Sequence, residues 1–245
     1  METMFPRINH EAVRLLVLAG CEVVSPRSQG CCGALQAHAG LRGVARDLAR
    51  ANVLAFDGAY DAIVTDSAGC GAALHEAPHL LRQDPLADRA GAFGARVRDV
   101  SQVLESLGLP ATATPLASPA DPARPLRVAY HDPCHLAHAQ NVRKEPRALL
   151  ARLPGVELVD LPNPDWCCGS AGTYNLTHPE MAEAQLKGKL DGVEAVAPDL
   201  VVASNPGCLL HMARGARERG LPARMVHLVE VLGMAYPAPG AGGRP

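Results

Sequence analysis

The sequence predicts an α/β fold built from two tandem repeats, each a small parallel-sheet unit with flanking helices. Similar segments recur in the same order about 136 residues apart, and in both copies helical patterns alternate with short apolar strands. Each copy also carries a Cys-Cys-Gly triplet, beginning at Cys31 and at Cys167, and a later Gly-Cys pair that ends at Cys70 or Cys208. The chain is therefore interpreted as two copies of one unit.

The first repeat predicts two helices and two strands. Residues 8–19 have helical apolar spacing, and Gly20 is expected to end that helix before a strand at 21–24. A second helix is predicted over 36–56 and a buried strand over 63–65. Strands joined by helices run parallel, so their carboxyl ends are expected at one edge of the sheet, where open parallel sheets bind ligands.

The cysteines of the first repeat fall close to that edge. Cys31 and Cys32 follow the first predicted strand, and Cys70 follows the second. Cys21 lies inside the first strand, and its counterpart in the second repeat is Val156. Because a free cysteine is often a small buried apolar residue, Cys21 is interpreted as part of the core.

The sequence of the second repeat predicts the same order of helices and strands as the first, with one additional strand. Strands are expected over 127–130, 156–159 and 199–203, and helices over 143–152 and 180–194. Cys134, the second Cys-Cys-Gly triplet and Cys208 each follow one of these strands. Three separate loops are therefore expected to bring four cysteines to one edge of the sheet.

Domain boundaries follow from composition. The first repeat is assigned to residues 1–108, and a linker rich in proline and alanine to 109–125, extended where the prolines dominate. The second repeat covers 126–236, and the residues after it, 237–245, are expected to form a disordered tail.

The first repeat is expected to be incomplete at its N-terminus. Cys134 stands 21 positions before Gly155, and the same distance before the equivalent Gly20 gives position −1. The first repeat is therefore expected to lack one ligand of a four-cysteine set. This leaves open whether it binds a centre, and whether the chain is one piece of a longer subunit.

Composition excludes several classes of partner. A net charge of −2 and an isoelectric point near 6.5 give no basic surface for nucleic acid. The sequence has no apolar run of the about 20 residues that a membrane-spanning helix needs, and no signal-peptide layout at its start. A cytoplasmic protein is expected, with peripheral attachment to the inner face of the membrane only through partners. Eight cysteines in a reducing compartment indicate metal ligation or redox chemistry rather than disulfides.

The second repeat supplies the four thiolates that a tetrahedral zinc ion or an iron-sulfur cluster requires. They are Cys134, Cys167, Cys168 and Cys208. Structural zinc sites usually take two close pairs such as Cys-x2-Cys, whereas these ligands come from three loops and include a contiguous pair. That spacing favours an iron-sulfur cluster over zinc, and redox-active thiols and simple burial stay open as alternatives.

Other residues are expected around this cysteine set. Gly169 lets the backbone approach a cluster closely, so that N–H groups can donate to sulfur. His135 and His211 are expected to surround the cluster rather than bind it, because a histidine near a metal is more often a neighbour of the ligands. His211, three residues after Cys208 on a helix, is kept as an alternative ligand.

Three stretches of the chain resemble the cysteine-rich (CCG) domain family. They are His131-Asp-Pro-Cys-His-Leu, Trp166-Cys-Cys-Gly-Ser-Ala-Gly-Thr-Tyr and Asn205-Pro-Gly-Cys-Leu-Leu-His-Met, and the second is most similar to iron-sulfur subunits of glycolate oxidase. The resemblance extends over nearly the whole chain apart from the linker and tail. It implies a 4Fe-4S cluster, cubane or noncubane, and an electron-transfer subunit of an oxidoreductase that acts on glycolate or a lactate-type 2-hydroxy acid.

The resemblance also implies partners and shows two departures. It implies a flavoprotein dehydrogenase subunit that delivers electrons, and membrane quinone as the acceptor. However, the chain has no ferredoxin-like Cys-x2-Cys-x2-Cys-x3-Cys-Pro run, and it has His211 and Ala73 where heterodisulfide reductase relatives have a cysteine. Two alternatives stay open: a thiol-disulfide redox subunit similar to heterodisulfide reductase, and a non-catalytic assembly module.

Overall fold

A four-stranded parallel sheet forms the centre of the second repeat in this computed structural model, which describes residues 4–237. Its strands are β3 (Leu126–Tyr130), β4 (Val156–Val159), β5 (Leu200–Ala203) and β6 (Arg224–His227), in the order β4-β3-β5-β6. All neighbouring strands are parallel, and Val128 of β3 pairs with Leu158 of β4 and with Leu200 of β5. The predicted α/β class is confirmed.

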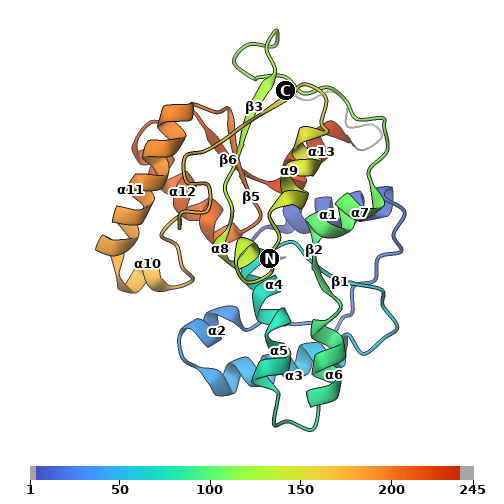
Figure 1. Cartoon of the computed structure of the whole chain (residues 1–245). Coiled ribbons are helices and arrows are strands. Elements are labelled where there is room, and N and C mark those ends of the chain that lie inside the picture. The colour runs from blue at the N-terminus through green and yellow to red at the C-terminus, as the bar shows by residue number, and fades with distance from the viewer. Residues whose placement is uncertain (1–3, 238–245) are drawn as a thin grey trace.

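Helices cover both faces of this sheet (Figure 1). On one face lie α9 (Lys144–Ala151) and α13 (Leu228–Ala235), and on the other lie α11 (Pro179–Val196) and α12 (Pro206–Glu218). Side chains along a strand alternate between the faces, so Val128 and Tyr130 pack with the first pair of helices and Ala129 packs with the second. Two short helices, α8 (Cys134–Ala137) and α10 (Tyr174–Thr177), lie in the connections after β3 and β4.

The first repeat has a smaller sheet. Among the residues described, only β1 (Ile63–Thr65) and β2 (Val97–Asp99) pair in it, in parallel. The helices around them occupy the lower part of Figure 1 and are α2 (Ala34–His38), α3 (Arg42–Ala55), α4 (Ala68–His75), α5 (Ala77–Leu80) and α6 (Ala87–Gly94). Val53, Leu81 and Phe93 are fully buried between these helices and form a core separate from that of the second repeat.

The two repeats pack against each other through two pairs of helices. α1 (Pro6–Leu18) of the first repeat contacts α13 of the second, and α7 (Val100–Leu107) of the first contacts α9 of the second. Leu15, Leu104, Leu150 and Leu232, one from each helix, are fully buried in a single shared core. Burial of each such side chain contributes roughly 2 kcal/mol. The shared core therefore holds the two repeats together as one body.

The predicted strand at 21–24 is wrong, because residues 21–26 form no regular secondary structure. In the second repeat the equivalent strand, β4, pairs along its whole length with β3. The described part of the first repeat has no counterpart of β3, so residues 21–24 have no neighbouring strand with which to form a ladder. Cys21 nevertheless packs against the shared core, as the sequence predicts.

The helix predicted over 36–56 is divided into α2 and α3. Gly40 lies between them with a φ of 77°, in the left-handed region. A glycine takes this conformation without a steric cost and commonly ends a helix there. The break turns the chain between α2, which follows the first Cys-Cys-Gly triplet, and α3 of the first repeat's core.

The segment predicted as a linker, residues 109–125, lies against the second repeat. The backbone N–H of Thr114 donates to the carbonyl of Ala235, and that of Leu116 donates to the carbonyl of Pro154, at 2.7 and 2.9 Å. The Leu116 side chain packs against the shared core. This segment is therefore fixed to the second repeat by backbone hydrogen bonds and apolar contacts.

The predicted tail at 237–245 lies outside the described residues except for Pro237. Within residues 4–237, every helix is too short or too polar to span a lipid bilayer.

Candidate metal centre

Three loops at the carboxyl edge of the second repeat's sheet carry the four predicted ligands. β3 leads to Cys134 at the start of α8, β4 leads to the loop with Cys167 and Cys168, and β5 leads to α12, whose first turn holds Cys208. The structure brings these four cysteines together, as parallel strands require of their carboxyl ends. Cys168 and Cys208 are buried, whereas Cys134 and Cys167 are partly exposed.

The turn between β3 and Cys134 is held by a buried ion pair. Asp132 is 3% exposed and accepts two hydrogen bonds from the guanidinium of Arg147 in α9, at 2.6 and 2.8 Å. The same guanidinium lies 5.0 Å from the centre of the Tyr130 ring. Because a bidentate pair fixes both distance and orientation, it sets the direction in which the chain leaves the strand.

The loop with the second Cys-Cys-Gly triplet depends on Gly169. Its φ is 90°, and a Cβ added there would lie 2.3 Å from the carbonyl oxygen of Ala182 in α11. Only glycine lets the loop close against α11 in this way. The Gly169 N–H then donates to Cys167 Sγ at 3.4 Å. The predicted close approach of the backbone to the sulfurs is therefore present.

Lys189 supports the same loop and was not among the predicted site residues. It is 2% exposed, and its ammonium donates to the carbonyls of Asn163 and Pro164 at 2.8 and 3.2 Å. The ammonium also lies close enough to Cys168 and Cys208 to interact with them electrostatically. Its position in the sequence could have indicated burial, because Lys189 lies three residues after the buried Leu186 and therefore on the same face of α11.

The four thiols form a continuous series of contacts. Hydrogen bonds from Cys134 and then from Cys168 hold the pKa of Cys167 at about 2. A hydrogen bond from Cys168 holds the pKa of Cys208 well below its usual value. The pKa values of Cys134 and Cys168 are raised, each chiefly by its contact with Cys167. Two thiols are thus ready to bind metal as thiolates, and binding of all four releases the remaining protons.

His131 also lies among these thiols. One of its ring nitrogens and the Sγ atoms of Cys168 and Cys208 lie within 4.8 Å of one another. His131 is 1% exposed, and neither ring nitrogen has a hydrogen-bond partner of acceptable geometry among the described residues. The sequence places His131 near the second cysteine set, three positions before Cys134, but the prediction assigns it no role. The available signal was strand alternation, which places residue 131 on the same face of the sheet as Ala129.

The two histidines predicted around the centre are both close to it. His211 is 5% exposed, and its unpaired Nε2 lies 3.1 Å from the position that a Cβ of Gly169 would take. His135 Nδ1 lies 3.6 Å from Cys134 Sγ, and its Nε2 lies 3.4 Å from Nε2 of His38 in α2. His135 therefore connects the cysteine set to the first repeat.

The cysteines of the first repeat form a looser set. Cys32 and Cys70 are partly exposed and in contact, and the hydrogen bond with Cys32 lowers the pKa of Cys70 to about 6. Cys31 is exposed, and its Sγ accepts a long hydrogen bond of 3.5 Å from the Gly33 N–H. The structure thus brings two of these three cysteines into contact and leaves the third at the surface.

Asn205 links the two cysteine sets. Its Nδ2 donates to Cys208 Sγ at 3.3 Å, and its Oδ1 accepts from the backbone N–H of Gly69 at 3.2 Å. Gly69 immediately precedes Cys70. The orientation of an amide that contacts a sulfur of the second repeat is therefore fixed by the first repeat.

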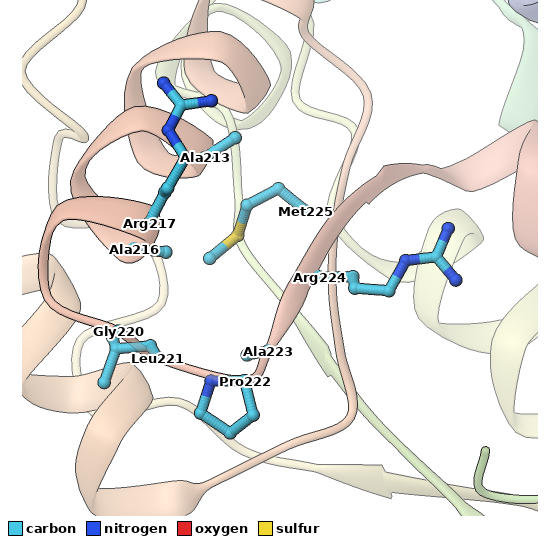
Figure 2. Close-up of a pocket in the computed structure, with 9 residues that line it drawn as sticks. All are labelled: Ala213, Ala216, Arg217, Gly220, Leu221, Pro222, Ala223, Arg224 and Met225. Carbon is cyan, nitrogen blue, oxygen red and sulfur yellow. The ribbon is translucent and has the colours of Figure 1, made fainter. Parts of the chain in front are cut away.

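A surface depression of about 520 Å³ lies elsewhere on the second repeat (Figure 2). It is bounded by the last turns of α12 and by the start of β6, with Arg217 and Arg224 at its sides. Neither cysteine nor histidine lines it, and it lies at the amino end of β6, away from the edge that carries the thiols. The depression is not part of the candidate centre.

The donor set of the second repeat fits a metal centre. Buried nitrogens of His131 and His211 make no hydrogen bond of acceptable geometry among the described residues, although His131 contacts Cys208. A buried polar atom that is left unsatisfied costs roughly 1–3 kcal/mol. A group that coordinates or hydrogen-bonds these nitrogens would offset that cost. Thiolate and imidazole donors suit both zinc and iron-sulfur clusters, so the chemistry of the donors alone is compatible with either.

Comparison with known proteins gives a consistent assignment. The chain is 41% identical over 236 residues to the probable glycolate oxidase iron-sulfur subunit of Bacillus subtilis (strain 168). The aligned residues make up 95% of this chain and 52% of that protein. It is 36% identical to the glycolate oxidase iron-sulfur subunit of Escherichia coli (strain K12), over 88% of this chain and 52% of that protein. The chain thus spans about half the length of these two relatives.

A third relative is matched over nearly its full length. The chain is 30% identical to lactate utilization protein A of Geobacillus thermodenitrificans (strain NG80-2), over 95% of this chain and 94% of that protein. The cysteine-rich domain family matches residues 1–75 and 128–213, which include both Cys-Cys-Gly triplets and all the thiol contacts described above. The chain belongs to this cysteine-rich (CCG) domain family.

Proposed function

We propose that the chain is an iron-sulfur electron-transfer subunit whose second repeat holds a 4Fe-4S cluster. The ligands are Cys134, Cys167, Cys168 and Cys208. The observation that carries the proposal is the continuous series of contacts among these four thiols, which come from three strand ends. Such a set has the number and charge of donors that the cluster requires.

Two features support an iron-sulfur cluster rather than zinc. The ligands come from three loops and include a contiguous pair, whereas structural zinc sites usually use two close pairs. Protein N–H groups also point at the sulfurs, from Gly169 to Cys167 and from Asn205 to Cys208. Hydrogen bonds of this kind stabilise an anionic cluster and set its reduction potential. The names of the glycolate oxidase relatives agree with this choice.

The proposed partner is a flavoprotein dehydrogenase that oxidises glycolate or a lactate-type 2-hydroxy acid. The flavoprotein binds the acid, and this chain takes up the electrons and passes them on. Cys134 and Cys167 are partly exposed, so one side of the cluster can approach a partner. The proposal includes membrane quinone as the acceptor and a cytoplasmic position at the inner face of the membrane, reached through the partner.

Anaerobic reconstitution of the full chain with ferrous iron and sulfide tests the proposal. We expect about four irons and four sulfides per chain, and absorbance that bleaches on reduction and returns on oxidation. A glycolate-oxidising flavoprotein supplied with glycolate should then reduce the cluster, and a water-soluble quinone should reoxidise it. The Cys168→Ser variant is the control, since it should accept no electrons.

Three results would contradict the proposal. Binding of zinc alone, with no iron after reconstitution, would exclude the cluster. Turnover of a small disulfide by the reduced protein without any flavoprotein would favour the thiol-disulfide alternative. Partner dehydrogenase activity that is unchanged by Cys168→Ser would favour a non-catalytic assembly module.

A further inference from the structure

We propose that the imidazole of His131 binds the iron-sulfur centre directly through a ring nitrogen, in addition to the four thiolates. This rests on the proposed function, because it concerns the same centre. It adds a donor of a different element and assigns a role to a residue that lies outside the cysteine motif. Four observations support it: strand alternation, the rigidity of the backbone, the burial of the imidazole and the positions of the competing histidines.

The alternation of side chains along β3 aims residue 131 at the thiols. Val128 and Tyr130 face the core shared by the two repeats, and Ala129 faces the core on the opposite side of the sheet. That second core contains Cys168 and Cys208. A side chain two residues beyond Ala129 points to the same face, because successive residues of a strand point to opposite sides.

The backbone on both sides of His131 is fixed. Its own N–H donates to the carbonyl of Val202 in β5 at 2.9 Å, which continues the parallel ladder by one residue. The N–H of Asp132 donates to the carbonyl of Pro164 at 3.0 Å, and the Asp132 carboxylate is paired with Arg147. A ligand held in this way is preorganised, since little conformational entropy is lost when it binds.

The imidazole is buried and contacts a thiol. His131 is 1% exposed, and neither ring nitrogen makes a hydrogen bond of acceptable geometry among the described residues, although the imidazole lies close enough to Cys208 to help lower the pKa of that thiol. One nitrogen lies within 4.8 Å of the Sγ atoms of Cys168 and Cys208, which are also within that distance of each other. Burial of an imidazole whose only such contact is with a thiol is costly, and coordination to iron would offset that cost.

The other two histidines are less well placed. His135 is in contact with His38 and lies at the partly exposed side of the cysteine set. His211 has one unpaired nitrogen, and that atom faces the backbone of Gly169. Among the described residues, His131 is the histidine whose ring nitrogen lies within 4.8 Å of two cysteine sulfurs that are themselves that close together.

Pulsed electron paramagnetic resonance of the reconstituted full chain tests this inference. The cluster is poised in its paramagnetic state, in protein grown with natural or with ¹⁵N-labelled histidine. We expect a strong nitrogen hyperfine coupling that changes with the label. It should disappear in His131→Cys and His131→Gln, and it should persist in the matched control His211→Gln.

Mössbauer spectra and the reduction potential of His131→Cys test the same ligand in two further ways. In a cluster of four irons, five protein donors leave one iron with two of them, so Mössbauer spectra of ⁵⁷Fe-loaded protein should contain one distinct iron site that His131→Cys alters. His131→Cys supplies a thiolate in place of the imidazole, so it should retain iron and sulfide but lower the reduction potential, because histidine ligands raise it relative to cysteine. Retained iron also shows that this variant folds.

The outcomes separate this inference from the proposed function. Wild-type protein that binds no iron and sulfide would sink the proposed function itself. Wild-type protein that binds a cluster but has only a weak nitrogen coupling would show that His131 is a hydrogen-bond donor and not a ligand. A strong coupling that survives in His131→Cys and disappears in His211→Gln would assign ligation to His211 and overturn the inference.

Discussion

The two repeats differ most at the strand that precedes their cysteines. In the second repeat β3 pairs with β4 and β5, and it leads directly to His131 and Cys134. The described part of the first repeat has no counterpart of this strand, and there residues 21–24 stay unpaired and Cys31 is exposed. Among the described residues, the repeat that has this strand is also the one in which four cysteines come together.

The largest expected difference between the repeats concerns the glycines of the two triplets. Gly169→Ala forces a Cβ to within 2.3 Å of a backbone oxygen, so we expect a loss of about 3–5 kcal/mol in the free energy of unfolding. Gly33→Ala meets nothing closer than 3.4 Å and adds only the cost of a positive φ, about 1–2 kcal/mol. Urea denaturation measures both values. Equal losses would show that the two loops are equally tight.

The next effect concerns the ion pair that fixes the turn before Cys134. Arg147→Ala leaves the buried Asp132 carboxylate without its partner, and we expect a loss of about 3 kcal/mol together with reduced iron binding. The matched control is Arg50→Ala in the first repeat, whose partner Asp84 is also a buried carboxylate but is not near a cysteine in the sequence. Thermal unfolding should show a smaller decrease in melting temperature for that control than for Arg147→Ala. The iron content of the control should be unchanged. A similar loss of iron in both variants would contradict the comparison.

A third effect distinguishes the equivalent helix caps of the two repeats by pH. Asp99 caps α7 and His227 caps α13, each in a capping box, and both are fully buried. Burial raises the pKa of Asp99 from 3.8 to about 6 and lowers the pKa of His227 from 6.5 to about 4. The stabilisation from Asp99 is therefore full below about pH 4 and is lost as the pH rises to about 6. The stabilisation from His227 is full above about pH 6.5 and is lost as the pH falls to about 4.

These two contributions oppose each other in the wild type and can be separated by substitution. In Asp99→Asn the contribution of the caps to the free energy of unfolding should rise by about 2–3 kcal/mol between pH 4 and pH 6.5, because His227 is the only one of the two caps that still titrates. In His227→Asn it should fall by a similar amount between pH 4 and pH 6. Urea denaturation at a series of pH values measures the slopes. Slopes of the same sign in both variants would refute this assignment.

The smallest effect concerns the amide that contacts Cys208. Asn205→Ala removes two hydrogen bonds, one that the amide donates to Cys208 Sγ and one that it accepts from the Gly69 N–H. We expect a loss of about 1 kcal/mol in the free energy of unfolding. Loss of an N–H donor to sulfur should also lower the reduction potential of the cluster. The matched control is Ser67→Ala, at the equivalent position beside Cys70. A redox titration should show no shift for the control. An equal shift would mean that the first repeat also tunes the cluster.

The sequence correctly predicts the strands that have a pairing partner among the described residues. The strands 127–130, 156–159 and 199–203 are present because each finds a partner in the sheet of the second repeat. The strand 21–24 fails because a strand depends on a neighbour as well as on its own residues. The break at Gly40 was missed because the helical periodicity continues on both sides of it.

The candidate site shows the same limit. Its four cysteines were predicted, because cysteine type and spacing are local properties of the sequence. His131 was placed near the cysteines but given no role, and Lys189 was missed, because their roles depend on which face of β3 and α11 meets the thiols, and that is set by packing. His38 was also missed, because its contact with His135 joins the two repeats across a long separation in the chain.

Iron and sulfide content after anaerobic reconstitution tests the central proposal that the cysteines of the second repeat hold the centre. Three proteins are compared: the wild type, Cys168→Ser and Cys32→Ser, which change equivalent positions of the two triplets. We expect about four irons per chain in the wild type and in Cys32→Ser, and almost none in Cys168→Ser. If Cys32→Ser loses as much iron as Cys168→Ser, or if Cys168→Ser keeps its iron, the proposal is contradicted.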